Sequence, residues 1–499
     1  MSQKTPVLFV QARKDRAKPL FRQVAEQIRT HISAGILPAG EKLPGVRTLA
    51  RQLNVSEDTV SQAYATLAEQ GIIEARPRSG YFVSGRLAAT GASPHPGIRQ
   101  TFPAGLPARN ALRIEEARRF AALPAGSCPE AVLLAGRPEH EEGGMKGWVS
   151  EAVRFAKSPW LLGSGAFSCG LPALRSAIAG RLRERRGISC GADSIILTTG
   201  FRQSLSLSLS LLFTPGESVL VESPCAPFIA SQLYACALNA VGCKVDGEGL
   251  AFSEEDPRLN ACRGAVLTPA CQMPLGVALA RRRKKQLLIW ARTSGAMLIE
   301  CDEGSEFPET DTPEMPLKAA PFGDECVVYC GGFSLSAPPA AGVGFIVAPK
   351  GLESAFAGAA ALAGAGPSLL EQRALAAYLQ SEAPALHERR MTLLARERRA
   401  ALRDLFARMP ESVGRLAQAA SGAWLSFVLA PEFAGIEPLV LKALSREDLP
   451  IVPLSSFAHA AGAVHGFAFN CLCLSRDELM RGAGALVRAI EENCGGRIV

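Results

Sequence analysis

In the second half of the chain, residues that could hold a small ligand follow a series of short apolar runs. These residues are Gly200, Gln203, Gln272, Asp302, Ser334 and Ser336. Asp302 has two open roles: its carboxylate binds the cationic nitrogen of a ligand, or it caps a neighbouring helix.

The elements that would position these residues alternate between helices and apolar strands from about residue 165. Short, wholly apolar strands alternating with helices favour an α/β fold whose mainly parallel sheet is covered on both faces. In such a sheet, ligands bind beyond the carboxyl ends of the strands. We therefore expect these polar residues to gather at one pocket.

The first 85 residues have the pattern of a helix-turn-helix followed by a β-hairpin. Apolar residues repeat at helical spacing from Leu20 to Ile32, and a turn rich in proline and glycine follows. Further helices are expected at 46–53 and after the capping residue Ser56, and two short strands flank 76–79. In a helix-turn-helix, the second helix enters the major groove of DNA by its N-terminal end.

This unit predicts a set of contacts to double-stranded DNA. Base edges or phosphates would be reached by Thr59, Ser61 and Gln62, and phosphates by Arg47, Arg51, Arg76 and Arg78. The charge distribution agrees, because six of the seven net positive charges of the chain fall within residues 1–90.

Composition excludes several classes of protein. With 48% apolar and 20% charged residues among 499, the chain can bury large cores and is not a disordered protein. The N-terminal apolar run is too short for a signal peptide, and the stretch 355–370 is expected to be a buried Ala-rich helix rather than a membrane span. The 14 cysteines show no metal-binding spacing, so we expect a cytoplasmic protein with reduced thiols and no metal. The basic cluster at 281–285 is expected to lie on a solvated helix face.

The N-terminal segment resembles the winged helix of GntR-type transcription regulators. The motif residues that match are Leu43, Pro44, Arg47, Leu49, Ala50, Val55, Ser56, Thr59 and Val60. The resemblance implies that Arg47, Ser56, Thr59 and Gly80 contact phosphates. The chain departs from the family at Glu57 and Asp58, where basic or neutral residues are usual; acidic residues there suit the helix dipole but repel phosphate.

Residues from about 120 to 495 resemble a fold-type I aminotransferase, an enzyme class that uses pyridoxal phosphate. The matching landmarks are the segments 170–175, 198–203, 222–224 and 269–276. A winged helix joined to such a region is the architecture of MocR-type regulators. By this resemblance, Asp302 pairs with the pyridine nitrogen of the cofactor, and a smaller α+β domain follows from residue 386.

The residues that the resemblance assigns to catalysis are replaced. Leu335 occupies the position of the lysine that forms the Schiff base, and a leucine has no amine with which to form one. Gly342 replaces the arginine that binds the phosphate, and Gly332 replaces a hydroxyl residue that helps it. Further replacements occur at Ala226, Cys271, Glu303 and Ala468. Lys318 and Lys350 are the nearest lysines that could substitute.

The expected protein is thus a DNA-binding regulator with four segments: a winged helix (1–86), a linker (87–118), an aminotransferase-like large domain (119–385) and a small domain (386–499). The resemblance implies a homodimer whose aminotransferase-like region serves dimerisation and the sensing of an unknown small-molecule effector, without a covalently bound cofactor. Non-covalent binding of pyridoxal phosphate stays open. The alternative is a pyridoxal-phosphate-dependent aminotransferase, or a regulator that senses this cofactor, fused to the DNA-binding domain.

Overall fold

The protein is described here from a computed structural model, which divides into two compact units, residues 1–106 and 107–499. The described residues are 19–22, 24–25, 28, 42–53, 55–69, 72–76, 80–84, 144–157, 169–311, 314–333, 342–364, 366–444, 451–458 and 464–494. The predicted linker 87–118 and the predicted site residues Arg78, Ser334, Leu335 and Ser336 lie outside them.

The first unit is a winged helix, as the sequence predicts. Its elements are α2 (Val46–Leu53), α3 (Glu57–Glu69), β1 (Ile73–Arg76) and β2 (Gly80–Val83). The two strands pair antiparallel, with Ile73 opposite Val83. Val24, Ile28 and Tyr64 are fully buried in the core of this unit. Val24 and Ile28 belong to the apolar repeat that begins at Leu20, so this repeat marks residues that pack into the core.

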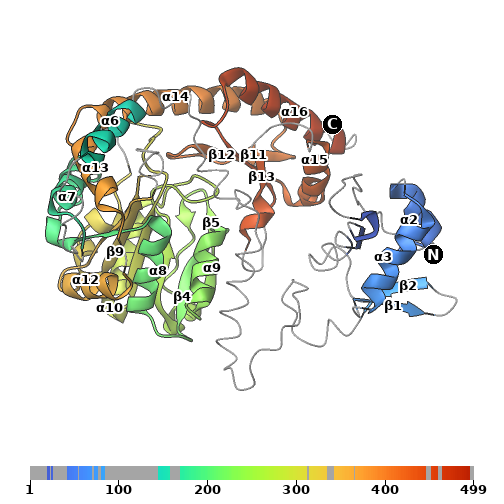
Figure 1. Ribbon diagram of the computed structural model, residues 1–499, viewed down its shortest axis with the longest axis horizontal. Coiled ribbons are helices and arrows are strands. Elements are labelled where there is room, and N and C mark those ends of the chain that lie inside the picture. The colour runs from blue at the N-terminus through green and yellow to red at the C-terminus, as the bar shows by residue number, and fades with distance from the viewer. Residues whose placement is uncertain are drawn as a thin grey trace. The chain divides into compact units, whose positions relative to one another are not determined.

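An eight-stranded, mainly parallel sheet forms the centre of the second unit (Figure 1). The spatial order is β3-β10-β9-β8-β7-β4-β5-β6. The strands are β3 (Ile195–Thr198), β4 (Ser218–Ser223), β5 (Asn239–Asp246), β6 (Gly249–Leu250), β7 (Cys262–Leu267), β8 (Met297–Asp302), β9 (Val327–Gly332) and β10 (Gly344–Val347). Strand β10 runs antiparallel to both β3 and β9. The predicted α/β fold is confirmed.

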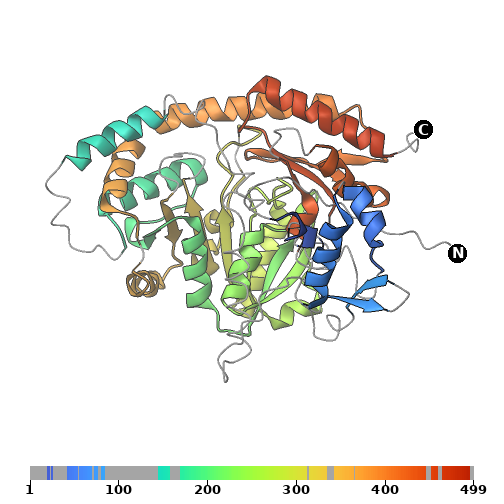
Figure 2. The same ribbon diagram turned by 45° about the vertical axis from the view of Figure 1, so that its right-hand side comes forward.

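Helices cover both faces of this sheet (Figures 1 and 2). They are α7 (Pro172–Arg186), α8 (Phe201–Leu212), α9 (Pro227–Ala235), α10 (Arg281–Ser294), α11 (Gly323–Cys326), α12 (Glu353–Leu362) and α13 (Leu369–Leu379). On β8, Ile299 and Cys301 belong to the buried cluster that contains Leu205 of α8, whereas Leu298 packs with Leu287 of α10. Successive side chains of a strand point to opposite faces, so α8, α9 and α12 cover one face, and α7, α10 and α13 the other.

A smaller antiparallel sheet, in the order β11-β12-β14-β13, forms the C-terminal part. Its elements are β11 (Gly414–Leu416), β12 (Trp424–Leu429), α15 (Glu437–Ala443), β13 (Ile451–Pro453), β14 (Gly466–Asn470) and α16 (Arg476–Cys494). The long helix α14 (Ala383–Phe406) runs along the top of the unit in the view of Figure 2, between α6 (Gly144–Ala156) and α16. This is the small α+β domain that the resemblance implies.

The basic cluster at 281–285 is only in part the solvated face that was predicted, because Arg281, Arg282 and Lys285 are exposed but the two residues between them are buried. Arg283 and Lys284 are 7% and 6% exposed. Arg283 binds the Asp246 carboxylate through two hydrogen bonds of 2.6 and 2.8 Å, and Lys284 lies 3.1 Å from Glu314. These cations fasten the start of α10 to neighbouring loops, since buried charges persist in proteins when they are paired.

The Ala-rich segment also differs from its prediction as a buried helix. It forms α12, but Phe356 and Ala360 are its buried residues and Leu362 is 93% exposed. Among the described helices, none combines the length and apolar character needed to cross a membrane.

The described cysteines form no disulfide bond with one another, and most are buried. Burial raises the pKa of Cys271 and Cys330 to about 12, so these thiols stay protonated at neutral pH. The described residues contain no cluster of histidine, cysteine and carboxylate side chains that could hold a metal ion.

Candidate functional site

The first candidate site is the N-terminal end of α3. The backbone N–H of Thr59 donates a hydrogen bond of 3.2 Å to the Ser56 hydroxyl, and the two hydroxyls lie 2.8 Å apart. Ser56 therefore caps the helix, as predicted. The Tyr64 hydroxyl donates to the Pro44 carbonyl oxygen at 2.7 Å, which fixes α3 to the turn before α2. This end of α3 is held in place before any DNA binds.

Ser61 and Gln62 are exposed, whereas Val60 and Ala63 on either side of them are completely buried. The core thus determines which face of α3 is presented to solvent. A contact of Ser61 or Gln62 with DNA remains a prediction, but both side chains are accessible for it.

Arg47, a predicted phosphate contact, forms an ion pair within the winged helix. Its Nε lies 3.4 Å from a carboxylate oxygen of Glu57, and both side chains are largely exposed. Glu57 opens α3, so the unusual acidic residue at this position partly neutralises the arginine nearest to it. Exposed ion pairs contribute little to stability. The effect of this pair is instead to reduce the positive charge that Arg47 presents to a phosphate.

The hairpin β1–β2 forms the wing. Arg76 is exposed, pairs with Glu74, and places its guanidinium 4.4 Å from the centre of the Phe82 ring. Gly80 has a φ of +100°, a conformation that glycine adopts without strain. Lys42 pairs with Phe82 as an isolated β-bridge and lies beside Gly80, so it adds a cation to the wing that the sequence did not reveal.

The second candidate site is the carboxyl edge of the large sheet, on the face covered by α8. Gly200 precedes α8 with a φ of +85°. The Gln203 side-chain oxygen accepts hydrogen bonds from the backbone N–H and the hydroxyl of Thr199, at 2.6 and 2.7 Å. Gln203 therefore closes the turn before its own helix.

Gln272 also serves the fold. This buried side chain donates to the carbonyl oxygens of Pro224 and Met273 at 2.7 and 2.8 Å, and accepts from the Leu275 N–H at 3.0 Å. These bonds join its own loop to the turn at Pro224 and leave one acceptor lone pair for a ligand.

Asp302 lies on the other face of the sheet, so the structure does not bring it together with Gly200 and Gln203. Its carboxylate accepts hydrogen bonds from the Arg186 guanidinium of α7 at 2.7 Å and from the Tyr329 hydroxyl at 2.5 Å. Neither role proposed from the sequence is found, because an arginine of the protein supplies the cation. The neighbouring residue, Cys301, is the one that faces α8.

Mostly apolar side chains meet at the α8-facing edge. Phe201, Ala226, Phe228, Cys271 and Cys301 are each at most 4% exposed and belong to one buried cluster. The rings of Phe201 and Phe228 meet edge to face at 5.5 Å.

Glu303 places a carboxylate at the α8-facing edge of the large sheet. A Cβ atom added to Gly332 would lie 3.7 Å from a Glu303 carboxylate oxygen and 3.6 Å from Phe201 Cβ. Gly332 stands where the resemblance places a phosphate-binding hydroxyl, so a carboxylate of the protein lies beside the position expected for the phosphate of pyridoxal phosphate. Like charges repel, so an ionised Glu303 would disfavour a phosphate group at this position.

Comparisons with known proteins agree with both halves of this description. The family model described as bacterial regulatory proteins of the gntR family matches residues 20–83. The probable rhizopine catabolism regulatory protein MocR of Rhizobium meliloti is 30% identical over 388 residues, which cover 77% of this chain and 76% of that protein. This chain belongs to the MocR-type GntR regulators.

Other matches fit this MocR-type assignment. The pyridoxine biosynthesis transcriptional regulator PdxR of Corynebacterium glutamicum is 28% identical over 90% of this chain and 91% of its own length. The α-aminoadipate aminotransferase LysN of Thermus thermophilus has a TM-score of 0.66 at 20% identity, covering 76% of this chain and 97% of that one. The kynurenine aminotransferase of Pyrococcus horikoshii has a TM-score of 0.65 at 20% identity, covering 79% and 98%. The protein is a DNA-binding transcription regulator with an aminotransferase-like fold.

Lys318 and Lys350, the two lysines nearest to Leu335 in the sequence, both lie away from the carboxyl edge that faces α8. Lys318 is 4% exposed, and its ammonium group donates to the carbonyl oxygens of Val327 and Ala348. Val327 is the first residue of β9, so Lys318 lies at the amino end of the strand, opposite the candidate edge. Lys350 is exposed on the turn after β10.

Sequence reasoning missed Lys42 and Arg186. Lys42 lies in a turn rich in proline and glycine, and nothing in that pattern indicates pairing with a strand 40 residues later. Arg186 is the last residue of α7, where a cation is favoured by the helix dipole. Its ion pair with Asp302, 116 residues away, depends on the fold and has no local signal.

Proposed function

We propose that the aminotransferase-like region of this MocR-type regulator is a dimerisation and effector-sensing module that performs no Schiff-base chemistry. The observation that carries this proposal is the charge at the α8-facing edge: Glu303 lies beside Gly332, while Asp302 is bound by Arg186 on the opposite face. Leu335 supplies no amine for the aldehyde of pyridoxal phosphate, and among the described residues the carboxylate at the end of β8 is held by an arginine instead of facing α8.

The proposed mechanism is a shift between conformations. A cytoplasmic homodimer presents two winged helices to paired half-sites, and its symmetry is matched by that of the operator. An effector that binds one arrangement of the dimer more tightly shifts the population towards it. Arg47, Arg76 and Arg78 neutralise phosphates, while Ser61 and Gln62 approach the base edges.

A spectrum tests the absence of Schiff-base chemistry. Because no amine is available at residue 335, purified protein mixed with pyridoxal phosphate should show no yellow aldimine absorbance. Borohydride treatment followed by mass spectrometry of the digested chain should find no stoichiometric pyridoxyl-lysine. An aminotransferase treated in parallel is the positive control, and a stoichiometric adduct on one lysine would refute the proposal.

The similarity to PdxR supports a second candidate, non-covalent sensing of pyridoxal phosphate. This candidate requires the unmodified cofactor to raise the melting temperature without the aldimine band. If Glu303 repels the phosphate, pyridoxal phosphate should stabilise the Glu303→Gln variant more than the wild type. Equal, large stabilisation of both proteins would favour cofactor sensing instead.

Gel-shift titration on the promoter region of its own or a neighbouring gene tests DNA binding. Since phosphate contacts release counterions, the affinity should fall steeply between 50 and 200 mM salt. Folded protein that does not bind at 50 mM salt would contradict the assigned contacts.

A further inference from the structure

Helix α3, the helix expected to enter the major groove, carries no positive charge. Its residues, Glu57–Glu69, include three carboxylates but no lysine, arginine or histidine. The cations of the winged helix lie on other elements, among them Arg47 and Arg51 on α2 and Arg76 on the wing. The elements around α3 can therefore bind phosphates, whereas α3 itself has no cation with which to do so.

The core of the winged helix determines which side chains of α3 face outward. Four hydrophobic residues that are 0% exposed mark its inner face: Val60, Ala63, Tyr64 and Leu67. At about 100° per residue, Asp58 lies about 170° round the helix from the centre of this face, and Gln62 and Ala65 lie about 150° from it. All three are exposed. Asp58 thus lies at the middle of the outer face of α3.

Short side chains surround Asp58 on this outer face. The exposed residues one turn further along the helix include Ser61 and Ala65, and both have small side chains. Because no long side chain projects there, the helix can approach the floor of the major groove closely. An aspartate, whose own side chain is short, then comes within reach of a base edge.

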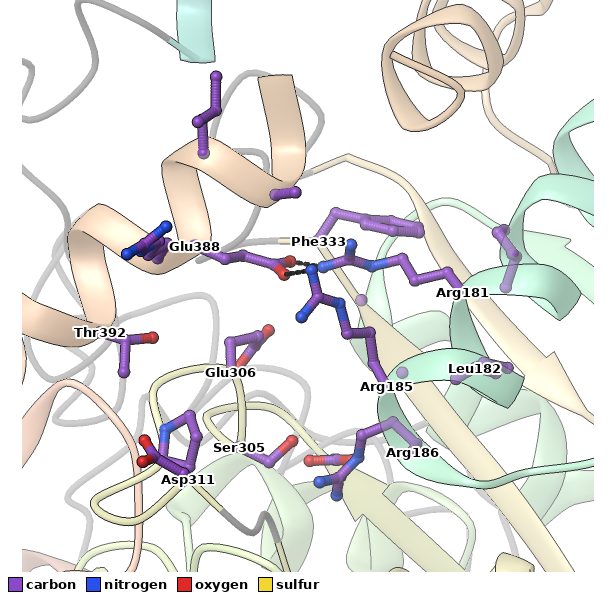
Figure 3. Close-up of a pocket in the computed structure, with 18 of the residues that line it drawn as sticks. Arg181, Leu182, Arg185, Arg186, Ser305, Glu306, Asp311, Phe333, Glu388 and Thr392 are labelled. Carbon is purple, nitrogen blue, oxygen red and sulfur yellow. Dashed lines mark hydrogen bonds and ion pairs between the residues drawn. The ribbon is translucent and has the colours of Figure 1, made fainter. Parts of the chain in front are cut away.

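The two acidic residues that open α3 have different surroundings. The Glu57 carboxylate lies 3.4 Å from Arg47 Nε. Carboxylates elsewhere in the chain are engaged by arginines in the same way, as Figure 3 shows for Glu388, at which two arginines of α7 point. Among the described residues, by contrast, the Asp58 side chain has no hydrogen bond and no ion pair. Asp58 is therefore the carboxylate of α3 that is free to meet DNA.

The chemistry of the major groove distinguishes the bases that such a carboxylate can meet. An ionised aspartate only accepts hydrogen bonds. Guanine presents two acceptors in this groove, thymine presents one acceptor, and adenine presents a donor beside an acceptor. Cytosine presents the donor of its N4 amino group and no acceptor. Cytosine is therefore the base that matches an unpaired carboxylate.

We propose that Asp58 determines part of the sequence specificity of this regulator, by accepting a hydrogen bond from the N4 amino group of a cytosine in each half-site. The inference rests on the DNA contacts in the proposed function, to which it adds a residue and the base that this residue reads. It is independent of any effector. The alternative is that Asp58 only stabilises the start of α3 through the helix dipole, in which case its charge disfavours every duplex equally.

Selection from a duplex library tests the identity of the base. The full chain is mixed at about 50 mM salt with duplexes that contain a randomised segment of about 30 base pairs, which is long enough for two half-sites, and the retained duplexes are sequenced. The wild type should select a C·G pair at one fixed position of each half-site. Asp58→Asn should select adenine there instead, because an amide pairs with N6 and N7 of adenine, and Asp58→Ala should show no preference.

Glu69→Gln is the matched control for this selection. Glu69 is also an exposed acid of α3, but it lies about three turns away at the other end of the helix. This variant should select the same sites as the wild type. Identical sites for the wild type and both Asp58 variants would overturn the inference alone. Folded wild-type protein that retains no duplex would refute the proposed DNA contacts, and the inference with them.

Affinities for two defined duplexes separate a base contact from charge repulsion. For the selected duplex, Asp58→Ala should bind about 5-fold or more weakly than the wild type, the usual effect of losing one base contact. For the same duplex with thymine in place of the cytosine, the variant should bind as tightly as the wild type or more tightly, because a carboxylate has been removed from the vicinity of phosphates. Tighter binding of the variant to both duplexes would show that Asp58 only repels DNA, and would refute the proposal.

Discussion

Replacing Arg399 by methionine should destabilise the second unit by roughly 3–5 kcal/mol, the typical cost of removing one partner of a buried ion pair. Arg399 lies on α14 and its side chain is 0% exposed. Its guanidinium donates to a Glu309 carboxylate oxygen at 2.7 Å, to the Phe307 carbonyl oxygen at 3.2 Å and to the Gly422 carbonyl oxygen. One side chain thus joins the long helix, the loop after β8 and the turn before β12.

The cost arises because methionine fills the space but donates no hydrogen bond, so the Phe307 and Gly422 carbonyl oxygens lose this donor and the Glu309 carboxylate keeps only Arg403. Burial alone would raise the pKa of Glu309, but Arg399 and Arg403 more than offset it, so the pKa lies below its usual value. The carboxylate is therefore ionised at neutral pH and needs a partner. The melting temperature of the second unit should fall by several degrees.

Arg403→Met is the matched control for this prediction. Arg403 binds the other oxygen of the same carboxylate at 2.6 Å, but its side chain is 43% exposed. Exposed ion pairs contribute about 0–1 kcal/mol, so its loss should be nearly neutral in differential scanning fluorimetry. Equal melting temperatures for the two variants would contradict the role given to Arg399.

The sequence was sufficient for the elements whose signals are local. The cap at Ser56 and the helix at 46–53 were both expected from neighbouring residues, and each is found in the structure. Gly187 ends α7 with a φ of +66°, as a C-cap glycine does. The alternation of apolar strands with helices likewise predicted a mainly parallel sheet.

Strand direction and strand face were harder to predict. The residues 342–349 have the same apolar composition as the parallel strands, yet β10 runs antiparallel, because direction is set by the connections and not by composition. At the end of β8, a shift of one residue separates Cys301, which faces α8, from Asp302, which faces α7. A carboxylate near the end of a strand therefore predicts a site only once its face is known.

Basic residues showed a similar limit. The cluster at 281–285 resembled a solvated face because charge runs usually are solvated. Arg283 pairs with Asp246, which lies 37 residues away, and Lys284 pairs with Glu314, which lies 30 residues away. No local sequence pattern indicates either partner. Ion pairs between segments far apart in the chain are therefore the contacts of this structure that are hardest to predict from a single sequence.

Replacing Glu57 by arginine should raise the affinity for non-specific DNA on the order of 50-fold at 0.1 M salt. The substitution removes the carboxylate that engages Arg47 at 3.4 Å and places a second cation at the start of α3. Two more phosphate contacts increase the steepness of log affinity against log salt by about 2, because each contact contributes about 0.9. Glu57→Gln, which only frees Arg47, should give roughly half of this change in slope.

Fluorescence anisotropy with a labelled duplex, titrated at several salt concentrations, measures both quantities. Glu69→Gln is the charge-matched control for Glu57→Gln, since Glu69 is exposed at the opposite end of α3. Arg47→Gln tests the coupling: it should weaken binding more in the Glu57→Gln background than in the wild type, because only there is the guanidinium unpaired. If Arg47→Gln has the same effect in both backgrounds, the ion pair does not limit DNA binding, and the acidic start of α3 acts by direct repulsion alone.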